Sequence, residues 1–394
     1  MALAVVLGVG MPAAALAGMS GQEVLIGVYG PYTGFAAQYG ISTKIALEIA
    51  CDDMDNKIGG VPLKIEYGDT ASKPAQAVNV MKKFVGNDRM LMVVGPVMSG
   101  CAEASFPVAN KAGMPALSPN AAVDGLTARN RPWTFRLREG TLIEAEHNAH
   151  LFRQNFPDLK TCCIIADHKD RYNKRNGVVL FPKILPKVGV KVLKELAFQS
   201  GDLDYSAQVT QIKQLKPDFI MFSAFAQDAA AIVKELRKQG LNCPLFGVSA
   251  GVTESAFLDL AGSAANGTFY LSNWAPGRQQ DPDNQRKIAE WSKRFPKKGQ
   301  KPASWHFWWY DAMRIVKKVI EESGVSNKPA DIKADRAKIR DALQSLKGYQ
   351  GTTNTITINK DGEIVPPEDR IQLTIRNGEY YWVLGPNKYK KVVR

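Results

Sequence analysis

The stretch Leu91–Ala122, LMVVGPVMSGCAEASFPVANKAGMPALSPNAA, decides the fold. An apolar strand, Leu91–Val94, runs into a loop of small residues, and the pattern after that loop predicts a helix over residues 101–111. A second strand, Met114–Leu117, leads into a small-polar loop at 118–122. Strand, loop, helix and strand at this spacing predict a βαβ unit with a right-handed crossover and a parallel sheet.

Both loops of this unit are expected at the carboxyl ends of strands, where open α/β sheets present a ligand crevice. Small residues there leave room for a bound molecule, and Ser99 together with the loop amides can bind an anion. The alternative interpretation, a pair of ordinary connections between strand and helix, stays open at this point.

Length and composition describe a globular chain. Its 394 residues predict two domains or one large one, and its 45% hydrophobic and 23% charged residues are typical of folded proteins. The net charge of +13 suits an anionic partner or general solubility. The basic residues are scattered and form no nucleic-acid motif, so we expect no nucleic-acid partner.

The N-terminus indicates export. Residues 2–17 form an apolar run that ends in the small-x-small pattern Ala15-Leu16-Ala17, which predicts a signal peptide over residues 1–17 and a periplasmic protein. The basic residues that usually precede such a run are missing, so we expect the true translation start to lie upstream. A buried N-terminal helix is the alternative. No other window has the length of a membrane-spanning helix.

The five cysteines, at positions 51, 101, 162, 163 and 243, do not form a metal-binding spacing. At least one is unpaired if the others form bridges. A disulfide bridge between Cys51 and Cys101 is one alternative in an oxidising compartment.

Strands and helices alternate along the rest of the chain. Further strands are predicted at Val24–Val28, Leu63–Tyr67, Thr134–Arg138, Cys162–Ala166, Val190–Ala197, Phe219–Phe222 and Leu245–Gly247. Helices are predicted over residues 41–56, 73–85, 173–188, 207–215, 229–239 and 305–319. This alternation predicts doubly wound parallel sheets in two lobes. The tail over residues 355–392 is β-like, with a turn at Asp361-Gly362 and a hairpin signal at Asn377-Gly378.

From about Val24 to Trp382 the chain resembles the periplasmic solute-binding proteins of branched-chain amino-acid ABC transporters, which are leucine-binding-like proteins of the type I periplasmic-binding fold. No single motif is specific, but their order and spacing are. The matching pieces are Ile26-Gly27, Thr33-Gly34, Gln38-Tyr39-Gly40, Gly59-Gly60-Val61, Val94-Gly95, Ser99, Ser118-Pro119, Leu126-Thr127-Ala128-Arg129 and Asp204-Tyr205.

The resemblance implies an α/β fold of two doubly wound lobes joined by a hinge of three crossovers, near Arg136, Tyr270 and Asp361. The expected lobes are residues 22–136 with 271–360 and residues 137–270 with 361–394. It further implies capture of a small-molecule solute between the lobes, delivery to an ABC permease in the membrane, a monomeric state, and neither an enzymatic activity nor a cofactor.

The same resemblance assigns candidate ligand-binding residues. Ser99 matches the residue that binds the carboxylate, Tyr39 and Tyr172 match pocket residues, Trp305 stands where a phenylalanine is common and Phe225 where a tyrosine is common. The remaining candidates flank these positions or depart from the pattern: Met98, Gly100, Asn120, Ala121, Ala122 and Ala250.

Two departures bear on the solute. Ala122 replaces a threonine hydroxyl, and Ala250 replaces the glutamate that faces the α-ammonium group in the amino-acid binders. A buried ammonium without a counter-charge is costly, so the sequence predicts a small organic acid without one, such as an aromatic or 2-oxo acid. A branched-chain amino acid is the alternative, with Asp228 or Glu254 as a substitute for the missing acid.

Parts of the sequence are compatible with other functions. Gly247-Val248-Ser249-Ala250-Gly251 spells the nucleophile elbow of α/β-hydrolases, with Ser249 as nucleophile, Asp281 or Asp283 as the acid and His306 as the base. His147 and His150, three residues apart, are compatible with a metal site but favour a solvated helix face. No dinucleotide fingerprint is present. A receptor ectodomain is a further alternative, because the same fold occurs fused to signalling modules.

Overall fold

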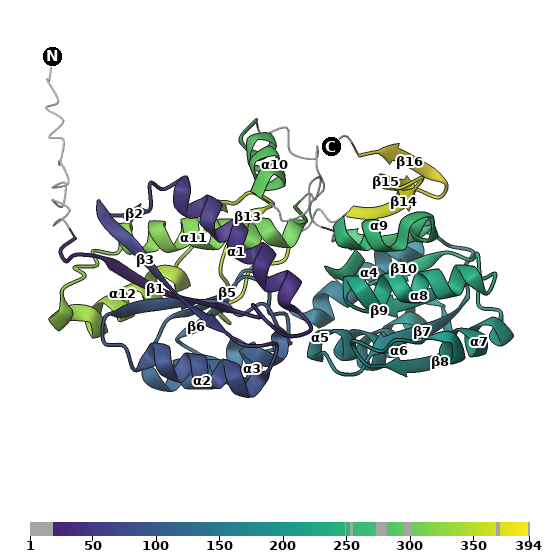
Figure 1. The fold of residues 1–394 in the computed structure, drawn as a ribbon, viewed down its shortest axis with the longest axis horizontal. Coiled ribbons are helices and arrows are strands. Elements are labelled where there is room, and N and C mark those ends of the chain that lie inside the picture. The colour runs from purple at the N-terminus through teal and green to yellow at the C-terminus, as the bar shows by residue number, and fades with distance from the viewer. Residues whose placement is uncertain are drawn as a thin grey trace, which may run out of the picture.

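The computed structural model describes residues 19–248, 250–252, 255–272, 282–294, 302–367 and 371–392. The expected signal peptide at residues 1–17 therefore lies outside the described residues, as do Ser249 and Glu254. Two α/β lobes lie side by side, each built on a sheet with helices on both faces (Figure 1). This arrangement confirms the predicted fold class of two doubly wound lobes.

The first sheet has the strand order β2-β3-β1-β4-β5-β6. Its strands are β1 Val24–Gly30, β2 Lys57–Ile58, β3 Val61–Asp69, β4 Met90–Val94, β5 Ala116–Ser118 and β6 Thr134–Arg136. All neighbours pair in parallel except the short β2, which pairs antiparallel with β3. β1 and β4 are buried along their whole length, as expected of central parallel strands with both faces covered.

Helices cover both faces of this sheet (Figure 1). One face packs against α1 Ala37–Asp52, α11 Ser304–Glu322 and α12 Ile332–Gln344. The opposite face packs against α2 Pro74–Val85 and α3 Ser99–Ala112. The turn η1 Ala128–Asn130, the turn η6 Pro329–Asp331, helix α10 Pro282–Arg294 and the strand pair β12 Tyr349–Gln350 and β13 Thr355–Ile356 complete this part of the molecule.

The second sheet has the order β16-β15-β14-β11-β10-β9-β7-β8. Its strands are β7 Thr161–Asp167, β8 Lys191–Phe198, β9 Phe219–Ser223, β10 Leu245–Gly247, β11 Thr268–Ser272, β14 Ile371–Arg376, β15 Glu379–Gly385 and β16 Lys388–Lys391. The strands from β8 to β11 pair in parallel, whereas β14, β15 and β16 add an antiparallel edge. The expected parallel lobe is therefore a mixed sheet.

Helices α7 Ser206–Leu215, α8 Ala226–Lys238 and α9 Ser255–Ala261 contribute to the core on one face of the second sheet. Helices α4 Thr141–Asn155 and α6 Phe181–Ile184 pack on the other face. Between β7 and β8 the helical path is continuous but irregular, with α5 Arg171–Lys174, the π-helical η2 Arg175–Leu180, α6 and η3 Leu185–Val188. The turns η4 Ala250–Val252 and η5 Gly262–Ala265 flank α9.

Two predicted helix starts and one predicted hinge crossing are wrong. Helix α1 begins at Ala37 rather than residue 41, which places Tyr39 on the helix instead of in a loop. Helix α3 begins at Ser99 rather than residue 101, because the small residues there adopt the first helical turn. Residues Thr268–Ser272 do not cross the hinge but form β11, which is held between β10 and β14 in the second sheet.

Two of the expected crossovers lie next to each other. Arg136, at the end of β6, forms a parallel bridge with Glu363 and an ion pair with its carboxylate. The guanidinium also donates to the carbonyl of Val123 at 2.7 Å. The Arg136 side chain is fully buried, and this burial lowers its pKa to about 10. The two connecting segments are therefore fixed to each other by a buried charge.

The five cysteines are free thiols, so Cys51 and Cys101 do not form a disulfide bridge. Burial raises the pKa of both to about 12, which keeps the thiols protonated. In the described part of the chain, no helix is both long enough and apolar enough to cross a membrane.

The predicted hairpin at Asn377-Gly378 joins β14 to β15, and both turn residues have positive φ angles, of 50° and 71°. Gly378→Ala is expected to lower the free energy of unfolding by about 1–2 kcal/mol, because a Cβ disfavours this backbone region. Gly86→Ala is the matched control, since Gly86 has a φ of −77°. Urea unfolding of both variants measures the difference, and equal midpoints would contradict the turn assignment.

Candidate ligand-binding site

The site begins at the N-terminus of α3. Ser99 is the first residue of this helix, and its Oγ accepts the amide of Ala122 at 3.1 Å. The hydroxyl proton of Ser99 has no acceptor among the described residues, so it can be donated to a bound molecule. The first-turn amides of a helix also lack intrahelical acceptors, which makes this corner suited to an anion.

The loop after β5 forms the floor beside Ser99. The Oγ of Ser118 donates to the carbonyl of Pro96 at 2.8 Å and accepts the amide of Ala121 at 2.9 Å. Asn120 is 8% exposed, and its side-chain oxygen accepts the indole N–H of Trp309. These hydrogen bonds connect the loop to Pro96 and Trp309 and restrict the conformations of the loop residues beside the cavity.

An aromatic wall comes from both lobes. The ring centroids of Tyr39 and Trp305 lie 5.3 Å apart, and those of Tyr39 and Phe225 lie 5.0 Å apart. Trp305 is only 3% exposed, and its Nε1 has no hydrogen-bond partner in the described structure. An indole N–H that is buried beside a cavity without an acceptor is a donor available to a ligand.

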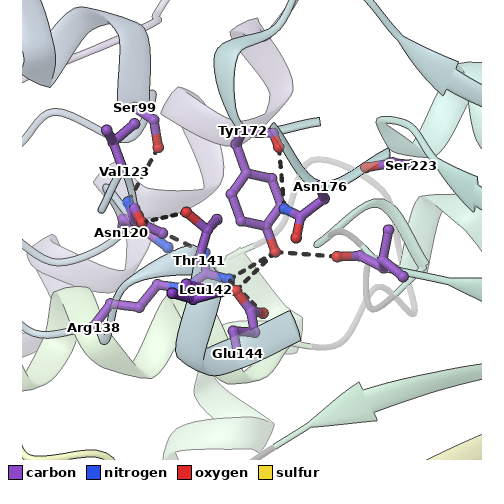
Figure 2. A network of polar contacts seen from close by, with 12 residues as sticks. Ser99, Asn120, Val123, Arg138, Thr141, Leu142, Glu144, Tyr172, Asn176 and Ser223 are labelled. Atoms are coloured by element: carbon purple, nitrogen blue, oxygen red, sulfur yellow. Dashed lines mark hydrogen bonds and ion pairs between the residues drawn. The ribbon is translucent and has the colours of Figure 1, made fainter. Parts of the chain in front are cut away.

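Arg138, Glu144 and Tyr172 form a charged cluster, and Arg138 and Tyr172 line the cavity (Figure 2). One guanidinium nitrogen of Arg138 lies 2.5 and 2.6 Å from the two oxygens of Glu144 and 2.9 Å from the hydroxyl of Tyr172. The Tyr172 hydroxyl is also 3.0 Å from the Glu144 carboxylate and 3.1 Å from the carbonyl of Val248. Burial alone would lower the pKa of Arg138, but Glu144 and Tyr172 outweigh it and raise that pKa, so the guanidinium of Arg138 keeps its proton.

Asp170 completes the lining from the N-terminus of α5. Its side chain is 3% exposed, and Oδ1 accepts the amide of Asn173 at 2.8 Å as the helix cap. Burial is the largest influence on this carboxyl, and together with the charge of Asp167 it raises the pKa of Asp170 to about 6 against the opposing amide bonds.

These groups line one small cavity with a volume of about 50 Å³. Among the predicted site residues, Tyr39, Met98, Ser99, Asn120, Tyr172, Phe225 and Trp305 line it. Its other lining residues, Val97, Arg138 and Asp170, were not predicted. Asp170 belongs to the polar loop after the strand at residues 162–166, so the rule that such loops face the crevice could have found it.

Gly100, Ala121 and Ala122 are not among the described residues that line the cavity. Gly100 faces the side chain of Arg171, since a Cβ on it would lie 3.5 Å from the Cβ of that arginine. Ala121 and Ala122 are fully buried. The amide of Ala121 donates to the Oγ of Ser118, and the amide of Ala122 donates to the Oγ of Ser99. Ala250 lies in η4, and its side chain is outside the described part of the structure.

The two lobes touch around the cavity. The amide of Ala226 in the second lobe donates to the hydroxyl of Tyr39 in the first at 3.1 Å. Arg171 pairs with Glu103 at 2.8 Å, and Arg175 pairs with Asp124 at 2.9 Å. These contacts join the first lobe to the second, next to the lining residues Tyr39, Asp170 and Phe225.

The described residues do not support the alternative sites, which are a hydrolase triad, a metal site and a substitute acid. His306 is fully buried, its Nδ1 accepts the amide of Ala303 at 2.8 Å, and burial lowers its pKa to about 3. His147 and His150 are exposed on α4, and the described residues contain no group of three metal-ligating side chains. Asp228 accepts the hydroxyl of Tyr205 at 2.9 Å and does not line the cavity, so its expected role as a substitute acid is wrong.

Two sheet-based lobes that meet around one small cavity define the class of two-lobed solute-binding proteins. Residues 23–367 match the family model described as periplasmic binding protein. The chain belongs to this family, and it is a transporter substrate-binding protein of the type I fold, not an enzyme.

Curated proteins with similar sequences are also solute-binding proteins. The chain is 27% identical over 354 residues to the Leu/Ile/Val-binding protein BraC3 of Rhizobium johnstonii, which covers 89% of this chain and 91% of the relative. It is 26% identical over 350 residues to the leucine-, isoleucine-, valine-, threonine- and alanine-binding protein of Pseudomonas aeruginosa, with 88% of each chain covered. These relatives place the chain among ABC-transporter substrate-binding proteins.

Solved structures show the same fold. A leucine binding protein, LivK, from Thermotoga maritima superposes with a TM-score of 0.79 at 21% identity, covering 94% of this chain and 98% of the other. An ABC-transporter solute binding protein from R. palustris in complex with benzoate superposes with a TM-score of 0.80 at 19% identity, covering 94% and 99%.

Proposed function

We propose that this protein is a periplasmic binding component of an ABC importer, which captures a small carboxylate-bearing solute and delivers it to a membrane permease. The observation that supports this proposal is the donor set in the cavity. The Ser99 hydroxyl proton, the Trp305 indole N–H and the start of α3 all offer hydrogen bonds without a described acceptor. Such a set stabilises a carboxylate in a site that excludes water.

The body of the solute is expected to be compact and apolar or flat. Tyr39, Phe225 and Trp305 supply aromatic surface at centroid distances of 5.0 to 5.3 Å, and Val97 and Met98 add aliphatic surface. An aromatic or 2-oxo acid fits the aromatic lining, and one structural neighbour was solved with benzoate. A branched-chain amino acid fits the aliphatic part, and the named curated relatives bind such amino acids.

Capture is expected to proceed by closure of the two lobes, residues 22–136 with 271–360 and residues 137–270 with 361–394. One lobe holds the carboxylate through Ser99, and the other brings Tyr172 and Phe225 over the solute. The hydrogen bond from the Ala226 amide to the Tyr39 hydroxyl is expected to form on closure, because its two groups belong to different lobes. A ligand that binds the closed form more tightly shifts the equilibrium towards it.

A thermal-shift panel followed by small-angle X-ray scattering tests this function. The panel contains leucine, valine, phenylalanine, benzoate, phenylpyruvate and 4-methyl-2-oxopentanoate. A ligand at about 1,000 times its dissociation constant adds about 4 kcal/mol to stability, which produces a clear rise in melting temperature. The same ligand is expected to reduce the radius of gyration.

The matched control is 3-methylbutan-1-ol, which has a branched apolar body but no carboxylate and is expected to change neither quantity. Stabilisation by the alcohol equal to that by the acids would contradict the carboxylate assignment. A saturating ligand that leaves the scattering profile unchanged would contradict closure.

A further inference from the structure

A second cavity, of about 650 Å³, lies in the second lobe away from the solute cavity. Its lining includes Pro244 and Gly267, which directly precede the parallel strands β10 and β11, and the end of β14. The amino ends of β10 and β11 lie at the edge of the sheet opposite to the carboxyl ends, where Phe225 follows β9 into the solute cavity. The described linings of the two cavities share no residue.

The described lining of the second cavity contains two guanidinium groups and no carboxylate. One of them belongs to Arg376, which is exposed at the end of β14. Its guanidinium carbon lies 4.2 Å from the centroid of the Tyr389 ring. A guanidinium that lies over a ring keeps the N–H groups at its edge available. Within the described part of the chain, Arg376 forms neither a side-chain hydrogen bond nor an ion pair, so those N–H groups can bind a ligand.

The other guanidinium belongs to Arg237, which is half-buried near the end of α8. Its terminal nitrogens donate to the carbonyls of Leu241 at 2.6 Å, Cys243 at 3.1 Å and Asn266 at 2.8 Å. These bonds fix the group in place, but no described carboxylate lies within 4.0 Å of it, and burial lowers the pKa of Arg237. A partly buried cation without a counter-charge is stabilised by an anion that binds beside it.

Neutral donors and apolar surface complete the second cavity. Asn242, Ser263 and Asn377 are exposed lining residues whose side chains form no hydrogen bond in the described structure. Phe269 and Pro244 add apolar surface. Guanidinium groups match the geometry of phosphate oxygens with two parallel hydrogen bonds. A volume of this size is typical of sites for organic ligands and exceeds what a phosphate ion alone would fill.

We propose that the second cavity is a binding site for an organic phosphate with a body about the size of a sugar or a nucleoside. Arg376 is the main anchor of the phosphate group, and the positive charge of Arg237 adds to its attraction. Tyr389 and Phe269 supply surface for the body of the ligand. This site is separate from the solute cavity, so the proposal does not depend on which solute the lobes capture.

Calorimetry of the full chain with two pairs of probes tests the proposal. The pairs are glucose 6-phosphate against glucose and adenosine 5′-monophosphate against adenosine, and the members of each pair differ only in the phosphate group. At least one phosphate is expected to bind, and its neutral counterpart is expected to bind more weakly or not at all. Arg376→Gln is expected to weaken that phosphate by about 10- to 150-fold, the range for hydrogen bonds to a charged group. Because Arg376 is exposed and unbonded, the variant should melt like the wild type.

Arg340→Gln is the matched control, because it removes the same charge from a similar place outside the cavity. The guanidinium carbon of Arg340 lies 4.6 Å from the Trp133 ring centroid, but its Nε lies 2.8 Å from a carboxylate oxygen of Asp341. With a net charge of +13 the chain attracts anions in general, and this control measures that attraction. The control is expected to bind the phosphate like the wild type.

Each other outcome overturns the proposal. If neither phosphate binds, or if the neutral probes bind equally well, the second cavity is not a phosphate site. Equal losses in Arg376→Gln and Arg340→Gln would show attraction by net charge alone. An unchanged affinity in Arg376→Gln, or competition between the phosphate and a carboxylate solute, would place the phosphate elsewhere. The proposed capture of a solute between the lobes stands in all these cases.

Discussion

Replacing Arg138 with methionine is expected to lower the free energy of unfolding by about 3–5 kcal/mol, the cost of leaving one partner of a buried ion pair alone. The side chains of Arg138 and Glu144 are only 11% and 15% exposed, so water cannot solvate the remaining carboxylate. The hydroxyl of Tyr172 also loses a donor 2.9 Å away. Urea unfolding followed by circular dichroism measures the loss.

The double variant Arg138→Met with Glu144→Gln distinguishes the stability lost through an unpaired buried charge from the stability lost through altered side-chain packing. Because it leaves no buried charge at this place, it is expected to recover most of the lost stability. Lys318→Met is the surface control, since Lys318 and Glu322 are 39% and 63% exposed and such helix pairs contribute about 0.3–0.5 kcal/mol. A double variant as unstable as the single one would show that packing, not charge, sets the effect.

Ser99→Ala is expected to weaken binding of the carboxylate solute by about 10- to 150-fold, which corresponds to the 1.5–3 kcal/mol of a hydrogen bond to a charged group. Ser99 is 4% exposed, and its Oγ accepts the Ala122 amide, so its hydroxyl proton remains available to a bound carboxylate. Calorimetry with the best ligand of the panel measures the change.

Ser118→Ala is the matched control for this variant. Ser118 is fully buried, and its Oγ accepts the amide of Ala121 at 2.9 Å, much as Ser99 accepts that of Ala122. It does not line the cavity. Both variants are expected to lose about 1–3 kcal/mol of stability from the unpaired amide, but only Ser99→Ala should lose affinity. Equal affinities in the two variants would remove Ser99 from the site.

The pattern of the chain was sufficient to predict where most of the cavity would form. Parallel strands meet the ligand at their carboxyl ends, and the loop after β4 follows this rule and yields Met98 and Ser99. Ala121 and Ala122, in the loop after β5, are not among the described lining residues, and their amides donate to Ser118 and Ser99. The periodicity of the sequence predicts where a loop lies, but it does not predict which way the backbone N–H groups of that loop point.

Residues from distant positions were harder to predict. Trp305 and Phe225 entered the candidate list only through a family resemblance, because nothing local marks an aromatic residue at the start of a helix as part of a site rather than of the core. Asp170, in the polar loop after β7, was not among the predicted site residues, although it lines the cavity.

The sequence by itself determined the alternation of strands and helices, the buried central strands β1 and β4, and the hairpin at Asn377-Gly378, since these follow from local periodicity and turn chemistry. Only the tertiary structure decided that β11 is an inner strand and that Arg138 is neutralised by Glu144. Charge pairing depends on which side chains share a low-dielectric space, and residues far apart in the chain come to share it only through packing.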